Sequence, residues 1–414
     1  MLRITDVKAA TVEANYQWTF VRVYAGDKSG TGEGFPAPQL ENVVKEYAPL
    51  LVGEDAFELA KVMEKLRWAA VPSGTSGINY HAFSAIEIAL LDLLGKYLNL
   101  PVYKLLGGKF RDSIRIYVDT HAGKALESMS RVLLPIAAKW MQELGINGKG
   151  ESNEPIHGRS TPMVYSEEYT PQAYASRASE MKREGFTAIK FDLDVPTPYT
   201  GRIQETGSLS NQEVKYLASI VEAVREAVGD ETDILFDLHW KYDIGSSIRL
   251  AKAIERFGVM WLEDPIPPEN IPLLREVTSS TVVPIASGEN LYGRYHFSQL
   301  FDTGIRIATP DATKTGGLLE TKFIAETAAM KEITISPHNI SSPIGTLAQA
   351  HLAASIPNFG VLEFHGHDVP LWHRLTRRRI IEKGFISVSD EPGLGVELDE
   401  NVAAKYAIAE RFDL

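Results

Sequence analysis

The chain has 414 residues, 44% of them hydrophobic, and its 42 basic and 54 acidic side chains give a net charge of −12. This length allows one large barrel plus a smaller domain, whereas the acidic balance argues against nucleic acids and anionic membranes as partners. Without cysteine, neither disulfides nor thiolate metal sites can form. No signal-peptide core or bilayer-length apolar run is present, so we expect a soluble, cytoplasmic protein.

Residues 1–112 predict an α+β domain with its own core. Strand-like runs separated by hairpin turns fill residues 2–35. Helical periodicity follows over residues 40–98 and is clearest over residues 81–96. We therefore expect a capping domain that precedes the larger unit.

A glycine-rich cluster, Gly30-Thr31-Gly32-Glu33-Gly34, superficially suggests a phosphate-binding loop. That motif needs a helix directly after it, but Pro36 and Pro38 follow instead. We therefore assign the cluster to strand and loop.

Strands alternate with helices over residues 113–374, a pattern typical of a parallel α/β sheet. Closing the strands on themselves is the economical arrangement, which gives a modified TIM (β/α)7-8 barrel with its active site at the carboxyl ends of the strands. The predicted strands cover residues 114–119, 188–192, 234–238, 260–263, 283–287, 305–308, 333–336 and 360–364.

Two segments lie outside this alternation. The connection over residues about 122–170 is too long for an ordinary loop and leaves the catalytic rim, so we expect it to form a lid or an oligomer contact. We expect the protein to be a homo-oligomer. Residues 375–414 return to short strands and a turn at 391–395. We expect this C-terminal segment to pack back on the capping domain and complete it.

Three acidic residues follow three predicted strands at equal intervals of 26 residues: Asp237, Glu263 and Glu289. A closed parallel barrel places successive strand ends side by side at one rim. Three carboxylates gathered there would form a site for a hard divalent cation. The alternative is three unrelated polar residues at strand ends, which the common register makes a poor explanation.

Other polar side chains fall at the same rim. A metal next to positioned bases suits the removal of a weakly acidic proton beside a carboxylate, because the metal stabilises the enediolate. Residues i and i+2 on a strand share a face, so Lys190 pairs with Asp192 and Asp237 with His239. The rim residues are His121, Lys190, Asp192, His239, Asp311, His338, Glu363 and His365.

Asp311 and His338 form the best candidate dyad, in which the carboxylate orients the imidazole and raises its basicity. This pairing requires the sixth and seventh strands to be neighbours. A rim histidine taken alone is more often structural, but His338 has a placed partner and His239 lies beside a presumed ligand. Lys190 could be a base, a carboxylate-binding cation or a partner of Asp192. The remaining histidines, for which we expect structural roles, are His81, His157, His296 and His351.

Further motifs are spread over almost the whole chain. They are the helix 85–96 followed by 101–108, the three carboxylates, Pro310-Asp311, Thr315-Gly316-Gly317, Pro337-His338 and the turn 392–395. Together they resemble the enolase superfamily, specifically its mandelate racemase subgroup and the acid-sugar dehydratases within it. The resemblance implies a histidine or lysine base and magnesium that stabilises an enediolate.

The resemblance also implies roles for individual residues. Asp237, Glu263 and Glu289 would be the magnesium ligands. His338 and Asp311 would form the catalytic dyad, and Glu363 would hydrogen-bond the carboxylate of the substrate. Lys190-Phe191-Asp192 stands where mandelate racemases have Lys-x-Lys, which counts against a simple racemase. Asp237-Leu238-His239 looks like the Asp-x-His of galactonate and mannonate dehydratases, and the long first connection resembles the mannonate type.

These features predict a magnesium-dependent dehydratase that converts an aldonic acid, gluconate or galactonate first, into a 2-keto-3-deoxy sugar acid. His239 and His338 would share the acid and base roles, with Lys190 and Asp311 beside them. Asp192, His121 and His365 would join Glu363 in binding substrate. A racemase or epimerase of a hydroxy acid, and a non-catalytic metal-binding scaffold, are the alternatives.

Overall fold

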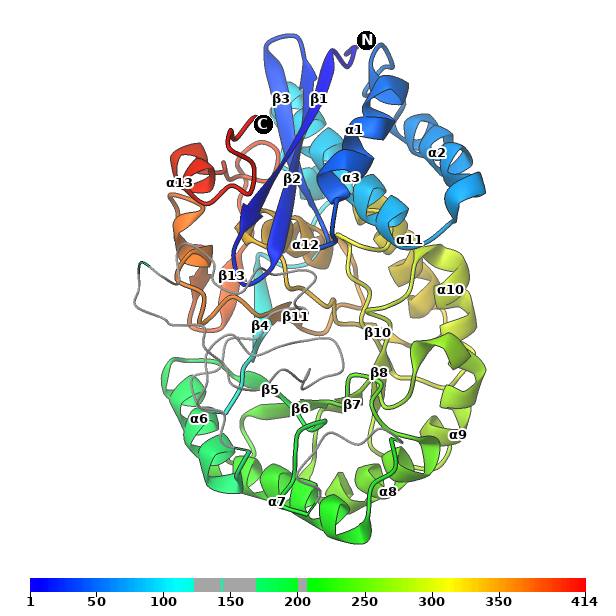
Figure 1. The fold of residues 1–414 in the computed structure, drawn as a ribbon, viewed down its shortest axis with the longest axis vertical. Coiled ribbons are helices and arrows are strands. Elements are labelled where there is room, and N and C mark those ends of the chain that lie inside the picture. Colours follow the sequence, from blue (N-terminus) through cyan, green and yellow to red (C-terminus); the bar gives the residue numbers. More distant parts are fainter. Residues whose placement is uncertain (123–142, 144–168, 200–206) are drawn as a thin grey trace.

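The computed structural model describes residues 1–122, 143, 169–199 and 207–414. An antiparallel sheet with its helices forms a cap over a barrel of strands surrounded by helices (Figure 1). The predicted long connection over residues 122–170 falls almost wholly outside the described residues, and so does His157. Within the described residues, no helix has both the length and the apolar character required to span a membrane.

The cap consists of a three-stranded sheet with helices packed against it. The strands pair in the antiparallel order β1-β2-β3. Helix α3 (Ile78–Leu98) is buried along most of its length, because it lies between the sheet and the barrel. The elements are β1 (Asp6–Glu13), β2 (Gln17–Ala25), β3 (Lys28–Gly34), α1 (Leu40–Leu51), α2 (Leu59–Ala70), η1 (Val71–Ser73), α3 (Ile78–Leu98) and α4 (Val102–Leu105).

The glycine cluster is part of β3, so its assignment to strand and loop is confirmed. A Cβ on Gly30 would lie 2.2 Å from the backbone of both Ala89 and Leu93 on α3. A Cβ on Gly32 would lie 2.2 Å from the carbonyl oxygen of Ala85. The glycines therefore allow α3 to approach the sheet closely.

Eight parallel strands close into a barrel. Each pairs with its predecessor, β11 pairs with β4, and an Ile335–Phe359 bridge joins the last two strands. All eight predicted strands are present, several of them shortened. They are β4 (Ser113–Asp119), β5 (Ala188–Asp192), β6 (Asp233–Asp237), β7 (Trp261–Glu263), β8 (Ile285–Ser287), β9 (Ile307–Ala308), β10 (Thr334–Ile335) and β11 (Leu362–Phe364).

Helices surround the barrel, and several begin at a residue whose side chain accepts a hydrogen bond from the first turn. Ser210 and Glu213 form a reciprocal capping box at the start of α7. After β11 the described chain forms only the short 3-10 helix η4 (Trp372–Arg374) before the next strand. The other helices are α6 (Pro171–Arg183), α7 (Asn211–Val228), α8 (Ile244–Ile254), η2 (Glu255–Phe257), η3 (Pro268–Leu273), α9 (Leu274–Thr278), α10 (Gly293–Leu300), α11 (Leu318–Ala329) and α12 (Pro343–Ser355).

The barrel interior below the strand ends is filled by apolar side chains. Almost every strand contributes one, and the ring of Tyr117 meets that of Trp261 edge to face at 5.6 Å. The barrel is therefore a packed core with a floor, rather than a pore. The layer consists of Tyr117, Ala188, Leu235, Trp261, Ala286, Ile307 and Val361.

Two buried glutamates of the cap hold it on the barrel. Glu87 of α3 accepts hydrogen bonds from the backbone N–H groups of Leu318 (2.8 Å) and Leu319 (2.9 Å), at the start of α11. Glu33 of β3 accepts from Ser342 and Gly345, at the start of α12. Helix N-termini favour carboxylates, yet burial raises the pKa of both groups to about 7.

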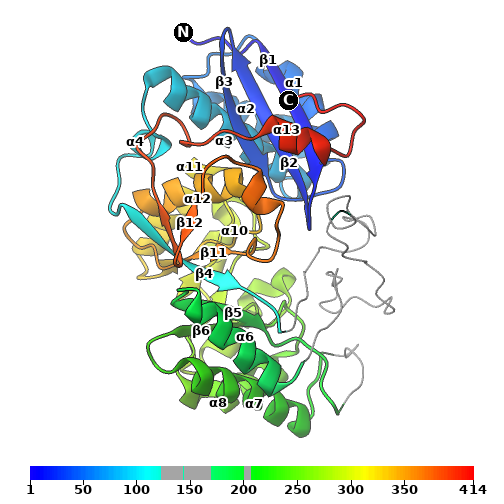
Figure 2. The same ribbon diagram turned by 90° about the vertical axis from the view of Figure 1, so that its left-hand side faces the viewer.

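The C-terminal segment joins both parts and completes the cap. It forms β12 (Ile381–Glu382), β13 (Phe385–Ser387) and α13 (Glu400–Lys405), and β13 pairs antiparallel with β4. Farther on, Glu397 pairs with Lys96 at 2.6 Å and Glu400 with Arg22 at 2.5 Å. Figure 2 shows α13 beside the cap sheet.

Candidate active site

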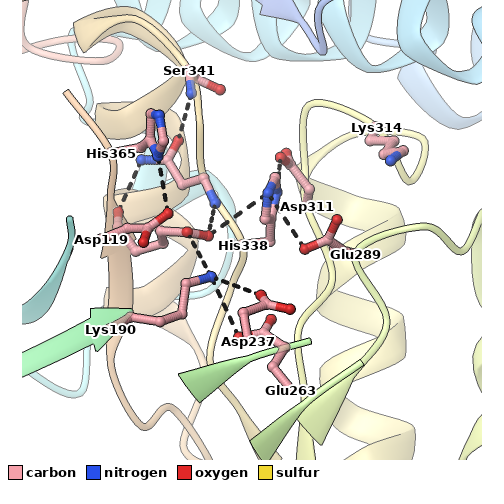
Figure 3. Close-up of polar contacts among 12 residues, drawn as sticks. Asp119, Lys190, Asp237, Glu263, Glu289, Asp311, Lys314, His338, Ser341 and His365 are labelled. Carbon is pink, nitrogen blue, oxygen red and sulfur yellow. Dashed lines mark hydrogen bonds and ion pairs between the residues drawn. The ribbon is translucent and has the colours of Figure 1, made fainter. Parts of the chain in front are cut away.

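Three carboxylates converge above the barrel floor. Asp237 ends β6, Glu263 ends β7, and Glu289 lies two residues after β8. One oxygen atom of each lies within 4.8 Å of the others, and all three residues are buried. Figure 3 shows them facing a common space. We call this group the carboxylate triad.

The triad has the donor set and the electrostatics of a cation site. Burial raises the pKa of Glu263 well above its usual range; Lys190 opposes the shift, while Asp237, Glu363 and Glu289 reinforce it. Oxygen Oε1 of Glu263 is buried and has no hydrogen-bond partner among the described residues. Buried carboxylates this close need a cation, and an all-oxygen set suits a hard divalent ion.

Lys190 lies on β5 beside the triad. Its Nζ is 2.9 Å from Glu363 Oε1, 3.2 Å from Asp237 Oδ2 and 3.4 Å from Glu263 Oε2. The same atom lies 5.3 Å from the centre of the Tyr117 ring on the barrel floor. Lys190 is thus positioned to balance the negative charge of this side of the site.

The predicted dyad is present as a contact: Nδ1 of His338 lies 2.8 Å from Oδ2 of Asp311. Strands β9 and β10, which precede these residues, are parallel neighbours. Oδ1 of Asp311 accepts hydrogen bonds from the backbone (2.8 Å) and the hydroxyl (2.6 Å) of Thr313. Gln349 of α12 donates to the His338 carbonyl at 3.0 Å, so both members are held in place.

The other ring nitrogen of His338 faces the site. Nε2 lies 3.7 Å from Oε2 of Glu289 and 3.8 Å from Oε2 of Glu363 (Figure 3). Burial alone would lower the pKa of His338, but Glu289, Glu363 and Asp311 outweigh it and raise this pKa to about 10.

His239 lies close to Asp237, as expected, but the two residues are not alternate positions on one strand as the sequence suggested. β6 ends at Asp237, and His239 adopts a φ of 40°, a conformation that few non-glycine residues adopt. Its Nδ1 lies 3.3 Å from Asp194 Oδ1, 3.7 Å from Asp192 Oδ1 and 3.9 Å from Asp237 Oδ1. Burial would lower the pKa of His239, but these carboxylates raise it well above its usual range.

A second histidine–carboxylate pair lies next to Glu363. Nδ1 of His365 is 2.9 Å from Oδ2 of Asp119, and its Nε2 is 3.2 Å from the hydroxyl of Tyr16, which comes from the cap. Glu363 itself accepts a hydrogen bond from the backbone of Asn339 at 2.9 Å. The cap therefore reaches the edge of the site through Tyr16.

His121 is close to Asp192, with 3.3 Å between Nδ1 and Oδ2. The structure thereby brings all the predicted site residues into one connected group at the carboxyl ends of the strands. It also adds Asp119, Asp194 and Gln349, which sequence reasoning did not select. Asp119 ends β4 and Asp194 lies two residues after β5, so the same strand-end pattern could have found both. Gln349 lies within α12, where no such pattern marks it.

Models of known families match most of the chain. The description "Mandelate racemase / muconate lactonizing enzyme, N-terminal domain" matches residues 5–107, and "Enolase C-terminal domain-like" matches residues 173–402. The fold and the site thus define a capped-barrel protein of the enolase superfamily. The chain belongs to its mandelate racemase and muconate lactonizing enzyme family.

Individual relatives are similar over nearly the full length. A D-xylonate dehydratase of Haloferax volcanii is 38% identical over 98% of this chain and 89% of its own. A D-gluconate/D-galactonate dehydratase of Picrophilus torridus is 29% identical over 91% and 84%. The solved structure of a mandelate racemase/muconate lactonizing enzyme-like protein of Rubrobacter xylanophilus has a TM-score of 0.86 and 38% identity, covering 99% and 98%.

Proposed function

We propose that this protein is a magnesium-dependent dehydratase of an aldonic acid and that its product is a 2-keto-3-deoxy sugar acid. One observation carries the proposal: two imidazoles, each with carboxylates near its Nδ1, flank the carboxylate triad. His338 Nε2 lies 3.7 Å from Glu289, and His239 Nδ1 lies 3.9 Å from Asp237. The names of the full-length relatives support the same reaction class.

Dehydration needs one group to remove the proton at C2 and another to protonate the departing 3-hydroxyl. His338 and His239 would share these two roles, and the order in which they act follows from the stereochemistry of the substrate. Loss of the C2 proton and of the 3-hydroxyl, together one water, leaves an enol. This enol tautomerises to the 2-keto-3-deoxy acid as its hydroxyl proton is released and C3 takes up a proton. Bound magnesium, held by the triad, would stabilise the charge that develops on the substrate carboxylate.

The surrounding residues would bind and orient the substrate. Glu363 and Lys190 would contact the substrate carboxylate region, since their side chains pair at 2.9 Å beside the triad. His365 and His121 would contact the substrate hydroxyls. We assign Lys190 a charge-balancing role rather than that of a base, because it lies within 3.4 Å of carboxylates on three strands.

The substrate is an aldonic acid of five or six carbons in this proposal. Gluconate and galactonate are expected from the sequence, and the relative at 38% identity supports adding D-xylonate. The test is incubation of the protein and magnesium with each acid, followed by detection of the keto acid with semicarbazide. Return of deuterium-labelled substrate from deuterated water, without any keto acid, would favour a racemase, and no turnover of any acid would favour a scaffold.

We also propose that the protein is a homo-oligomer. Trp68, Tyr295 and Met330 are large side chains that are 70%, 80% and 79% exposed on the surface of this chain. Burial against another copy would remove them from water. Light scattering after size-exclusion chromatography measures the mass, and a monomer at micromolar concentration would contradict the proposal.

A further inference from the structure

A second hollow lies on the outer side of the barrel, where the fold departs from a complete set of helices. After β11 the chain forms only η4 before β12, so no long helix follows this strand. A cavity of about 370 Å³ remains between the end of α6, the outer face of β11 and the segment 372–383. Figure 2 faces this side of the molecule, with α6 and β12 on either side of β4. We call the cavity the outer pocket.

The floor of the outer pocket consists of packed aromatic rings. Phe186, Phe364 and Trp372 contribute to it and are all buried. The rings of Phe364 and Trp372 meet edge to face at 5.0 Å, and those of Phe186 and Phe364 stack at 6.4 Å. Such a floor offers a flat apolar surface to a ring or another apolar group of a ligand.

The rim is strongly basic. Arg377, Arg378, Arg379 and Lys383 line it, against the single carboxylate of Glu184. This is unusual in a chain with a net charge of −12. An excess of cations around a hollow attracts anions.

Most of these cations are not neutralised within the chain. Among the described residues, the side chains of Arg378 and Lys383 have no hydrogen bond or ion pair, and that of Arg379 donates only to the carbonyl of Ile381. Within the described part of the chain, Arg377 is the only one of the four with a carboxylate partner, Asp399 at 3.3 Å. Guanidinium groups bind phosphate through paired hydrogen bonds, so this rim suits a phosphate group.

We propose that the outer pocket binds a small organic phosphate, whose phosphate is held by Arg378, Arg379 and Lys383 and whose apolar body lies on the aromatic floor. The pocket is separate from the carboxylate triad but shares strand β11 with the candidate active site. Phe364 faces the pocket, while its neighbours Glu363 and His365 belong to the candidate active site, as expected from the alternation of side chains along a strand. This inference does not depend on the reaction proposed above.

The test is calorimetric titration of the full chain, in magnesium buffer, with phenyl phosphate, inorganic phosphate and phenol. We expect phenyl phosphate to bind at least tenfold more tightly than either of the others, because it alone engages both rim and floor. The double substitution Arg378→Ala and Arg379→Ala should weaken phenyl phosphate binding by at least about tenfold, since each charge-assisted hydrogen bond contributes roughly that factor.

The control is Arg256→Ala, which removes an exposed arginine that pairs with Glu222 of α7 and does not line the pocket. Affinity in this variant should equal that of the wild type. The exposed positions of Arg378 and Arg379 predict unchanged thermal unfolding in the double variant. Unaltered affinity in the double variant, binding of inorganic phosphate as tight as that of phenyl phosphate, or no binding at millimolar concentration would each overturn the proposal.

Discussion

His338 and Asp311 lie 27 residues apart in sequence, yet Nδ1 of the imidazole is 2.8 Å from Oδ2 of the carboxylate. The parallel pairing of β9 with β10 creates this contact. Thr313 holds the other carboxylate oxygen, and the imidazole therefore presents Nε2 to the carboxylate triad. A histidine oriented in this way is suited to transfer a proton.

Replacing His338 with Asn should lower kcat by about a thousandfold, the typical contribution of a positioned acid or base. Binding of magnesium should persist, because the triad is unchanged. Keto-acid formation and calorimetric titration with magnesium measure the two effects. His296→Asn is a matched control, since among the described residues the His296 side chain accepts only a local backbone hydrogen bond, from Tyr292. Activity retained in His338→Asn would remove the dyad from the mechanism.

Magnesium should stabilise the folded protein through the triad. Ligand linkage adds roughly 2.7 kcal/mol at a concentration one hundred times Kd, so the wild-type Tm should rise on addition of magnesium and fall with EDTA. In Glu263→Gln this rise should be lost, because one of three oxygen ligands no longer carries charge. Glu222→Gln, an exposed surface change, should keep it. A full magnesium-induced rise in Glu263→Gln would show that the ion binds elsewhere.

The contribution of Glu87 to the stability of the folded protein, through its contact between cap and barrel, should depend on pH. Its folded-state pKa of about 7 lies above the ordinary value of 4.5, so its contribution to stability is complete below pH 4.5 and is lost as pH rises through 7. Gln does not titrate. The loss of unfolding free energy caused by Glu87→Gln should therefore be larger at pH 5 than at pH 8, by up to about 3 kcal/mol.

Denaturant unfolding of both proteins at the two pH values measures this difference, and other titrating groups cancel in the comparison. Equal losses at pH 5 and pH 8 would mean that Glu87 keeps an ordinary pKa. Glu33, buried at the start of α12, should behave in the same way.

The close approach of α3 to β3 should make Gly30 intolerant of a side chain. A Cβ there would lie 2.2 Å from backbone atoms of Ala89 and Leu93, so Gly30→Ala should lower the unfolding free energy by about 3 kcal/mol or more. Gly245→Ala in α8 is the control, because the nearest atom is 3.5 Å away and alanine should add about 0.5–1 kcal/mol of helix stability. Similar Tm values for the two variants would argue against this packing.

Sequence by itself determined the barrel strands, the carboxylate triad and the dyad. These follow from local patterns: an apolar run predicts a strand, and a polar residue after each run falls at one rim because parallel strands in a barrel end together. The same regularity led from Asp237 to Glu263 and Glu289. This regularity did not predict the conformation of His239, because the strand ends at Asp237 and the chain then turns with a positive φ at His239.

Only the tertiary structure decided the contacts between distant parts of the chain. Asp119 meets His365 across 246 residues because β11 closes the barrel against β4. Glu87 reaches the start of α11 because the cap sits on the strand ends, and the outer pocket exists because no long helix follows β11. No local sequence pattern predicts these features. Each depends on how helices and strands distant in sequence pack together and on which surfaces that packing leaves uncovered.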